Sequence, residues 1–72
     1  MTLDTRIRSW RKLRKLSQRA LGALIGVSGA TVAQWENGST SPTQGNLEKL
    51  AGALGLTMEQ FFGALPEAEA AA

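Results

Sequence analysis

The chain has 72 residues, a net charge of +2 and neither cysteine nor histidine. A chain of this length forms one small domain. Without cysteine it has no disulfides or thiolate metal ligands, and without histidine it lacks the commonest metal ligand and general base. We therefore expect no metal, no cofactor and no enzymatic activity. No apolar run approaches the roughly 20 residues that span a bilayer, so we expect a cytoplasmic protein that does not bind membranes.

Basic residues gather at the start of the chain. Seven of the eight lie within residues 1–19, where Asp4 is the only acidic residue. Residues 1–19 therefore carry a net charge of +6 and the remainder carries −4. Such segregation indicates either an anionic partner or a solvated basic helix face.

Glycines, prolines and capping residues divide the chain into five helical segments, none of which alternates with the period of a strand. Ser17, Ser28 and Thr57 have the character of N-caps, whereas Gly26 and Gly38 are typical helix stops. The expected segments cover about residues 4–15, 17–26, 28–38, 44–54 and 57–63. These segments predict a domain of residues 1–63, followed by a flexible tail at 64–72.

The apolar residues of these segments predict one small helical core. Trp10 and Trp35 are expected to be its largest members. The buried face of the second segment is expected to contain Ala20, Leu21, Leu24 and Ile25, with the small Ala20 allowing another helix to approach closely.

Only Gly26 and Val27 separate the second segment from the third. Two capped helices joined by a short turn with a glycine are typical of the helix-turn-helix unit, whose second helix enters the major groove of DNA. A generic pair of antiparallel helices is the alternative that this spacing leaves open.

Several spaced motifs agree in order and separation with one known family. They are LSQ at 16–18, LIGVS at 24–28, TVAQWENG at 31–38 and LxxLAxALG at 47–55. Over about residues 7–63 the chain resembles the phage Cro and repressor family, also called the XRE family. The resemblance implies an all-α, five-helix, lambda-repressor-like domain with a central helix-turn-helix. It also implies a sequence-specific, double-stranded-DNA-binding transcriptional regulator, expected to be a repressor, with helix 29–36 in the major groove.

The resemblance assigns roles to matching positions. Gly29, Ala30 and Gln34 match base-contacting positions, and Thr31 is close enough to them to reach a base or a phosphate. Gln18, Asn37 and the loop that begins at Ser39 match phosphate-contacting positions. Arg11 and Glu36 match a structural ion pair between the first helix and the end of the recognition helix. From their charge or their place at a helix start, further phosphate contacts are expected from Lys12, Arg14, Arg19 and Ser28.

The front of the expected recognition helix carries little chemistry. Gly29 has no side chain, Ala30 offers a methyl group that suits a thymine methyl, and Gln34 alone has the geometry for a bidentate adenine contact. Three explanations stay open: the helix sits deeper in the groove, specificity depends on DNA shape, or specificity is weak.

The expected partners are an operator and a second copy of the chain. Family members often bind palindromic half-sites as dimers, so we expect a weak homodimer. Its interface is expected around Leu56, Phe61, Phe62 and Leu65. Adjacent residues on a helix point about 100° apart, so one of the two phenylalanines should lie outside the monomer core and be available to a second copy. Two alternatives remain: an antitoxin-type module that binds and masks a toxin, or a fragment of a longer repressor.

Overall fold

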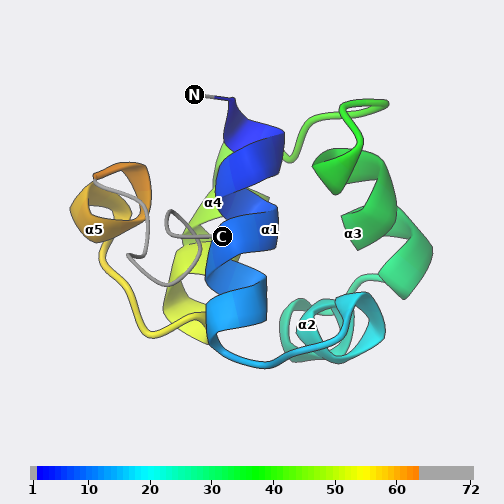
Figure 1. Cartoon of the computed structure of the whole chain (residues 1–72), viewed down its shortest axis with the longest axis horizontal. Coiled ribbons are helices and arrows are strands. Elements are labelled where there is room, and N and C mark those ends of the chain that lie inside the picture. The colour runs from blue at the N-terminus through cyan, green and yellow to red at the C-terminus, as the bar shows by residue number, and fades with distance from the viewer. Residues whose placement is uncertain (1, 64–72) are drawn as a thin grey trace.

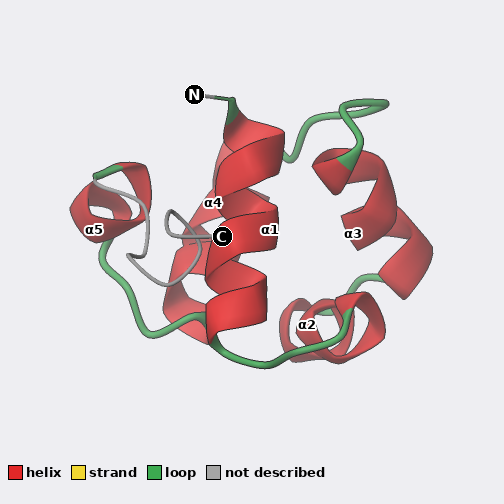
Figure 2. Cartoon of the chain, in the orientation of Figure 1, coloured by secondary structure: helices red, strands yellow, loops and turns green. Residues whose placement is uncertain are grey.

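The computed structural model describes residues 2–63. The helices are α1 (Leu3–Leu13), α2 (Gln18–Ile25), α3 (Gly29–Glu36), α4 (Gln44–Ala53) and α5 (Met58–Phe62). Figure 1 shows α1 crossing the centre of the molecule, with α2 and α3 on one side and α5 on the other. Within the described residues every regular element is a helix (Figure 2), as the sequence predicts. None of these helices is long and apolar enough to cross a membrane.

Hydroxyl side chains begin four of the five helices. Each accepts a hydrogen bond from the backbone N–H three residues later, at 2.9–3.1 Å, and the four are Ser17, Ser28, Thr43 and Thr57. Thr57 forms a full capping box, because the Gln60 side chain accepts from the Thr57 N–H in return. The predicted caps at Ser17, Ser28 and Thr57 are thus confirmed, and each satisfies a backbone donor that the helix itself leaves unpaired.

Helices α1 to α4 all end in the same C-terminal backbone motif. A residue with positive φ follows each helix, and the next N–H then bonds a carbonyl five residues back, which is the Schellman arrangement. Glycine occupies this position after α2, α3 and α4, but Lys15 occupies it after α1 with φ 57°. A side chain in this conformation costs about 1–2 kcal/mol, so the end of α1 is locally strained.

The core collects apolar residues from all five helices. Its buried members are Ile7, Leu21, Ile25, Val32, Trp35, Leu50, Ala51, Leu54 and Phe61. Trp35 is buried as predicted, and Trp10 is partly buried against the core. The prediction for Leu24 is wrong, because its side chain is 60% exposed. Leu24 is offset around α2 from the stripe formed by Leu21 and Ile25, and this offset leaves it in solvent.

Candidate nucleic-acid interface

The turn between α2 and α3 brings their backbones into close contact. Gly26 adopts φ 81°, and the Val27 N–H donates to the Gly22 carbonyl at 2.9 Å. A Cβ at the buried Gly22 would lie 2.5 Å from the Val27 carbonyl oxygen. The sequence predicted that Ala20 would allow a close approach to α2, and the structure shows such an approach at Gly22. This contact fixes the position of α3 relative to α2.

The outer face of α3 is small and uncharged. Val32, Trp35 and Glu36 point into the domain, and the opposite side presents the exposed Ala30, Gln34 and Asn37, with the half-buried Ala33 beside them. Ala30 and Gln34 lie one turn apart on this face. The helix therefore leaves its amide and methyl groups accessible along one side, as a helix that enters a groove requires.

Gly29 stands at the start of α3 against the backbone of α2. A Cβ at Gly29 would lie 3.0 Å from the Arg19 Cα and 3.1 Å from the Arg19 nitrogen. Such distances are tighter than ordinary van der Waals contact. The structure therefore supplies a packing reason for Gly29 that the sequence did not reveal, although its role as a base-contacting position stays a prediction.

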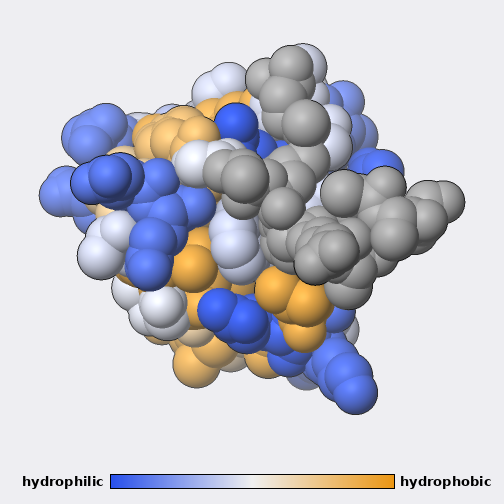
Figure 3. Space-filling view, turned by 60° about the vertical axis from the view of Figure 1, so that its left-hand side comes forward, coloured by the Kyte–Doolittle hydropathy of each residue, from blue (hydrophilic) through white to orange (hydrophobic). Residues whose placement is uncertain are grey.

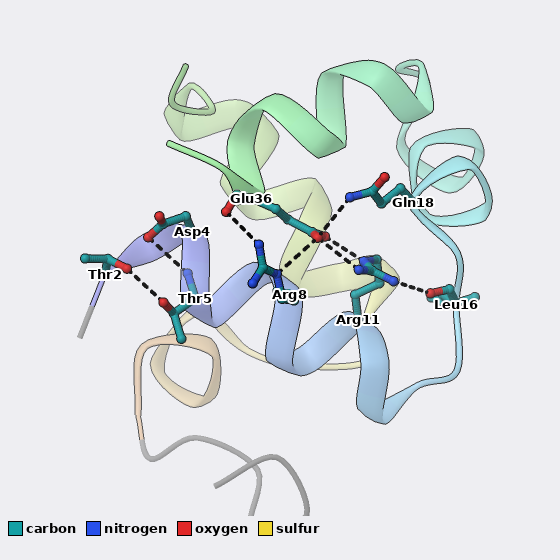
Figure 4. Close-up of polar contacts among 8 residues, drawn as sticks. All are labelled: Thr2, Asp4, Thr5, Arg8, Arg11, Leu16, Gln18 and Glu36. Carbon is teal, nitrogen blue, oxygen red and sulfur yellow. Dashed lines mark hydrogen bonds and ion pairs between the residues drawn. The ribbon is translucent and has the colours of Figure 1, made fainter. Parts of the chain in front are cut away.

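The carboxylate of Glu36 joins three helices (Figure 4). Arg11 donates to it twice, from Nε to Oε2 at 2.6 Å and from Nη2 to Oε1 at 2.9 Å, and Gln18 Nε2 donates to Oε1 at 3.1 Å. Arg8 Nε lies 3.8 Å from the same Oε1. The Glu36 side chain is 1% exposed, so these donors compensate for the loss of its hydration. The expected pair of Arg11 and Glu36 is present, and Gln18 and Arg8 join it.

Three arginines, Arg6 and Arg8 of α1 and Arg14 directly after it, are bound to the ends of other helices. Arg6 donates to the Phe61 and Gly63 carbonyls at the end of α5, and Arg8 to the Glu36 carbonyl at the end of α3. Arg14 Nε donates to the Leu54 carbonyl at the end of α4, at 2.8 Å, with its guanidinium 5.8 Å from the centre of the Trp10 ring. Helix C-termini have unpaired carbonyls and a partial negative charge, which favour cations. The basic start of the sequence therefore has a structural role that its charge alone did not indicate.

Three basic side chains of residues 2–19 remain without such contacts. Lys12, Lys15 and Arg19 are exposed, and their side chains form no hydrogen bond or ion pair with the described chain. Of the predicted phosphate contacts, Lys12 and Arg19 are thus free to meet an anion. Arg14 Nε is already bonded to the Leu54 carbonyl at the end of α4, and phosphate binding by Arg14 stays a prediction.

The other expected phosphate contacts lie at helix ends and in the loop after α3. Ser28 Oγ accepts from the Thr31 N–H and lies 3.0 Å from the Thr31 hydroxyl. Asn37 is exposed, and its Oδ1 accepts from the Ser39 N–H at 2.9 Å. Gln18 is half-buried beside Glu36. Phosphate binding by these residues stays a prediction.

The expected dimer residues divide into different environments. Phe61 is fully buried in the domain, so it has no surface for a second copy and its assignment to the interface is wrong. Phe62 is 45% exposed, with its ring edge-on to Phe61 and the ring centres 5.1 Å apart. Leu56 is partly buried against the core, and Leu65 lies outside the described residues. On the side of the molecule where α5 lies, Figure 3 shows hydrophobic residues interspersed with hydrophilic ones.

The turn, the packed pair α2 and α3, and the free outer face of α3 define a helix-turn-helix domain. The chain belongs to the Helix-turn-helix family, whose family model matches residues 7–61. The resemblance seen in the sequence is thereby confirmed, and with it the five-helix fold.

Individual relatives agree with this family. The chain is 47% identical over 52 residues to Repressor protein C2 of Salmonella phage P22, a match that covers 72% of this chain and 24% of that protein. It is 41% identical over 51 residues to the HTH-type transcriptional regulator DicA of Escherichia coli K12, covering 71% of this chain and 38% of DicA. The chain thus spans about a quarter to two fifths of the length of these relatives.

Solved structures share the fold. The solution structure of the DNA-binding domain of the P22 C2 repressor matches with a TM-score of 0.84 and 37% identity, covering 93% of this chain and 90% of that chain. The P22 C2 repressor in complex with a synthetic operator matches with a TM-score of 0.77 and 38% identity, over 85% and 92%. Hydroxypropylphosphonic acid epoxidase from S. wedmorenis matches with a TM-score of 0.73 and 29% identity, over 89% of this chain and 32% of the enzyme. This fold therefore also occurs as part of an enzyme.

Proposed function

We propose that the chain is a sequence-specific, double-stranded-DNA-binding regulator of transcription that acts as a repressor. The observation that carries the proposal is the free, uncharged outer face of α3 in a helix-turn-helix domain. Its likeness to a repressor that was crystallised with a synthetic operator supports the same function. A regulator that binds operator DNA must share the compartment of that DNA, and we propose that this compartment is the cytoplasm.

In the proposed complex α3 lies in the major groove and meets the bases through its outer face. Gln34 contributes a bidentate contact to an adenine, and the Ala30 methyl packs on a thymine methyl. Thr31 is positioned beside them, although its hydroxyl lies near Ser28 Oγ. Lys12, Asn37 and Ser39 contact phosphates on either side of the groove. Arg19 lies at the N-terminal end of α3, where both a phosphate and a base are within the reach of an arginine.

The fixed position of α3 supports this mechanism. The Glu36 carboxylate ties the last turn of α3 to Arg11 of α1 and Gln18 of α2, and Gly22 holds the turn close to α2. A reading helix needs such support, because a small displacement separates its side chains from the base edges. The chain acts as a weak homodimer, in which the exposed Phe62 contributes to the contact between copies.

A selection from random duplex DNA at two salt concentrations tests the proposal. We expect a palindromic motif with half-sites about one helical turn apart. A bound pool without any motif, with binding lost steeply as salt rises, would contradict sequence-specific binding. That outcome would favour a protein partner, such as a toxin, as the target of the domain.

A further inference from the structure

The start of α2 lies directly against the start of α3. The position of a Cβ at Gly29 is 3.0 Å from the Arg19 Cα and 3.3 Å from the Arg19 Cβ. Arg19 therefore projects from α2 at the N-terminal end of α3. In the proposed complex this is the end that enters the major groove first.

The first residue of α3 faces Arg19, and the residues beside it on the helix are very small. Gly29 and Ala33 are one turn apart and share one side of the helix, and Ala30 follows on the outer face. No side chain longer than a methyl group lies at these three positions. The side chains of Gly29, Ala30 and Ala33 are therefore too short to block an arginine that starts beside Gly29 and extends along α3 toward the bases.

Arg19 differs from the arginines of α1, because within residues 2–63 its side chain has no hydrogen bond or ion pair. Arg19 is exposed. It also stands in the first turn of α2, which contains no acidic residue, and a cation is unfavourable at a helix N-terminus. A residue that opposes local helix stability without a compensating contact is typical of a functional position.

We propose that Arg19 reads a base in the major groove and does not merely contact a phosphate. Its guanidinium donates two hydrogen bonds to O6 and N7 of a guanine, next to the base pairs that face Ala30 and Gln34. Arg19 thus supplies the charged base contact that the outer face of α3 lacks. This inference rests on the proposed function, because it requires α3 to enter the groove.

The test compares four full-length proteins in the same selection from random duplex DNA: the parent chain, Arg19→Ala, Arg19→Lys and Lys12→Ala. Lys12→Ala is the matched control, since Lys12 is also exposed and forms no hydrogen bond or ion pair with residues 2–63 but belongs to α1. Affinities are then measured for the selected site and for the site with its guanine replaced by adenine. Thermal unfolding of each variant checks the fold, and we expect Arg19→Ala to melt no lower than the parent chain.

We expect the parent chain to prefer guanine at one fixed position of each half-site, by on the order of 5- to 150-fold over adenine. Arg19→Ala should reduce this ratio to about 1 and leave the other positions unchanged. Arg19→Lys should also relax it, because lysine cannot form the bidentate contact. Lys12→Ala should weaken binding to both sites equally, with the motif unchanged.

Two results would overturn the proposal, and they differ. If Arg19→Ala selects the parent motif with every preference intact and only a uniform loss of affinity, Arg19 is a phosphate contact and the proposed function stands. If the parent chain selects no motif, sequence-specific binding itself fails and the role of Arg19 fails with it.

Discussion

Arg11 holds the carboxylate of Glu36 through two hydrogen bonds, 2.6 Å from Nε and 2.9 Å from Nη2, and so connects α1 to the last turn of α3. The Arg11 side chain is 12% exposed and the Glu36 side chain 1%. Arg11 also donates to the Leu16 carbonyl at 2.8 Å, in the segment that leads into α2 (Figure 4). The side chain thereby fixes both halves of the helix-turn-helix to α1.

Arg11→Ala should destabilise the domain strongly. Removing one partner of a buried pair costs about 3–5 kcal/mol, because the buried Glu36 would keep only the Gln18 hydrogen bond and Arg8 at 3.8 Å. In a domain of this size each kcal/mol lowers the melting temperature by roughly 4–8 °C, so thermal unfolding followed by circular dichroism will report the loss. The neighbouring Lys12→Ala serves as control and should change stability by less than about 0.5 kcal/mol. Equal melting temperatures for the two variants would show that the pair contributes nothing to stability.

Gly22→Ala should loosen the helix-turn-helix. The new methyl group would meet the Val27 carbonyl oxygen at 2.5 Å and the Ser28 backbone at 3.0 Å, and overpacking of this kind costs about 1–3 kcal/mol. Gly52→Ala is the matched control, because a Cβ at Gly52 in α4 meets nothing within 4 Å. That variant should gain about 0.5–1 kcal/mol from helix propensity. Urea unfolding of both variants measures their free energies of unfolding. A Gly22→Ala variant more stable than the parent chain would disprove the close approach.

Lys15→Gly should stabilise the domain by about 0.5–1 kcal/mol. Lys15 has φ 57° at the end of α1, where glycine avoids a steric cost of about 1–2 kcal/mol but loses more chain entropy on folding. Lys15→Ala removes the same charge and keeps the Cβ, so it should bring no such gain. Denaturant midpoints separate the two effects. If alanine stabilises as much as glycine, the cause is the charge and not the backbone.

Phe61 and Phe62 should respond differently to the same substitution. Phe61→Ala removes a fully buried ring at a cost of about 3–5 kcal/mol, which is a large part of the stability of a small domain. Phe62 is 45% exposed, so Phe62→Ala should leave the monomer nearly as stable but weaken the proposed dimer. Sedimentation at several concentrations measures the association. Unchanged association in Phe62→Ala would place the dimer contact elsewhere.

The helix ends could be predicted from the sequence because their signals are local. Ser17, Ser28 and Thr57 each bond a backbone N–H within their own first turn, and a capping residue is recognisable from its immediate neighbours. Gly26 and Gly38 likewise follow their helices with φ 81°. Thr43 caps α4 in the same way, but it follows the loop of residues 39–42 and was not among the predicted caps.

The remaining features depend on residues far apart in the sequence. Arg14 bonds the carbonyl of Leu54, 40 residues away, and no local pattern distinguishes such an arginine from one that binds a phosphate. The exposure of Leu24 and the contact of Gly29 with Arg19 likewise follow from how the helices pack. The pair of Arg11 and Glu36 was predictable only through the family resemblance, since 25 residues separate its members.

The most direct test of the central claim is the affinity of Gln34→Ala for the selected DNA site and for random DNA, measured side by side. Gln34 is the exposed side chain of α3 with the geometry for a bidentate adenine contact. We predict that the variant binds its selected site more weakly by about 1–3 kcal/mol while binding to random DNA is nearly unchanged. An equal loss on both kinds of DNA, or no loss on either, would contradict the claim that the outer face of α3 reads the bases.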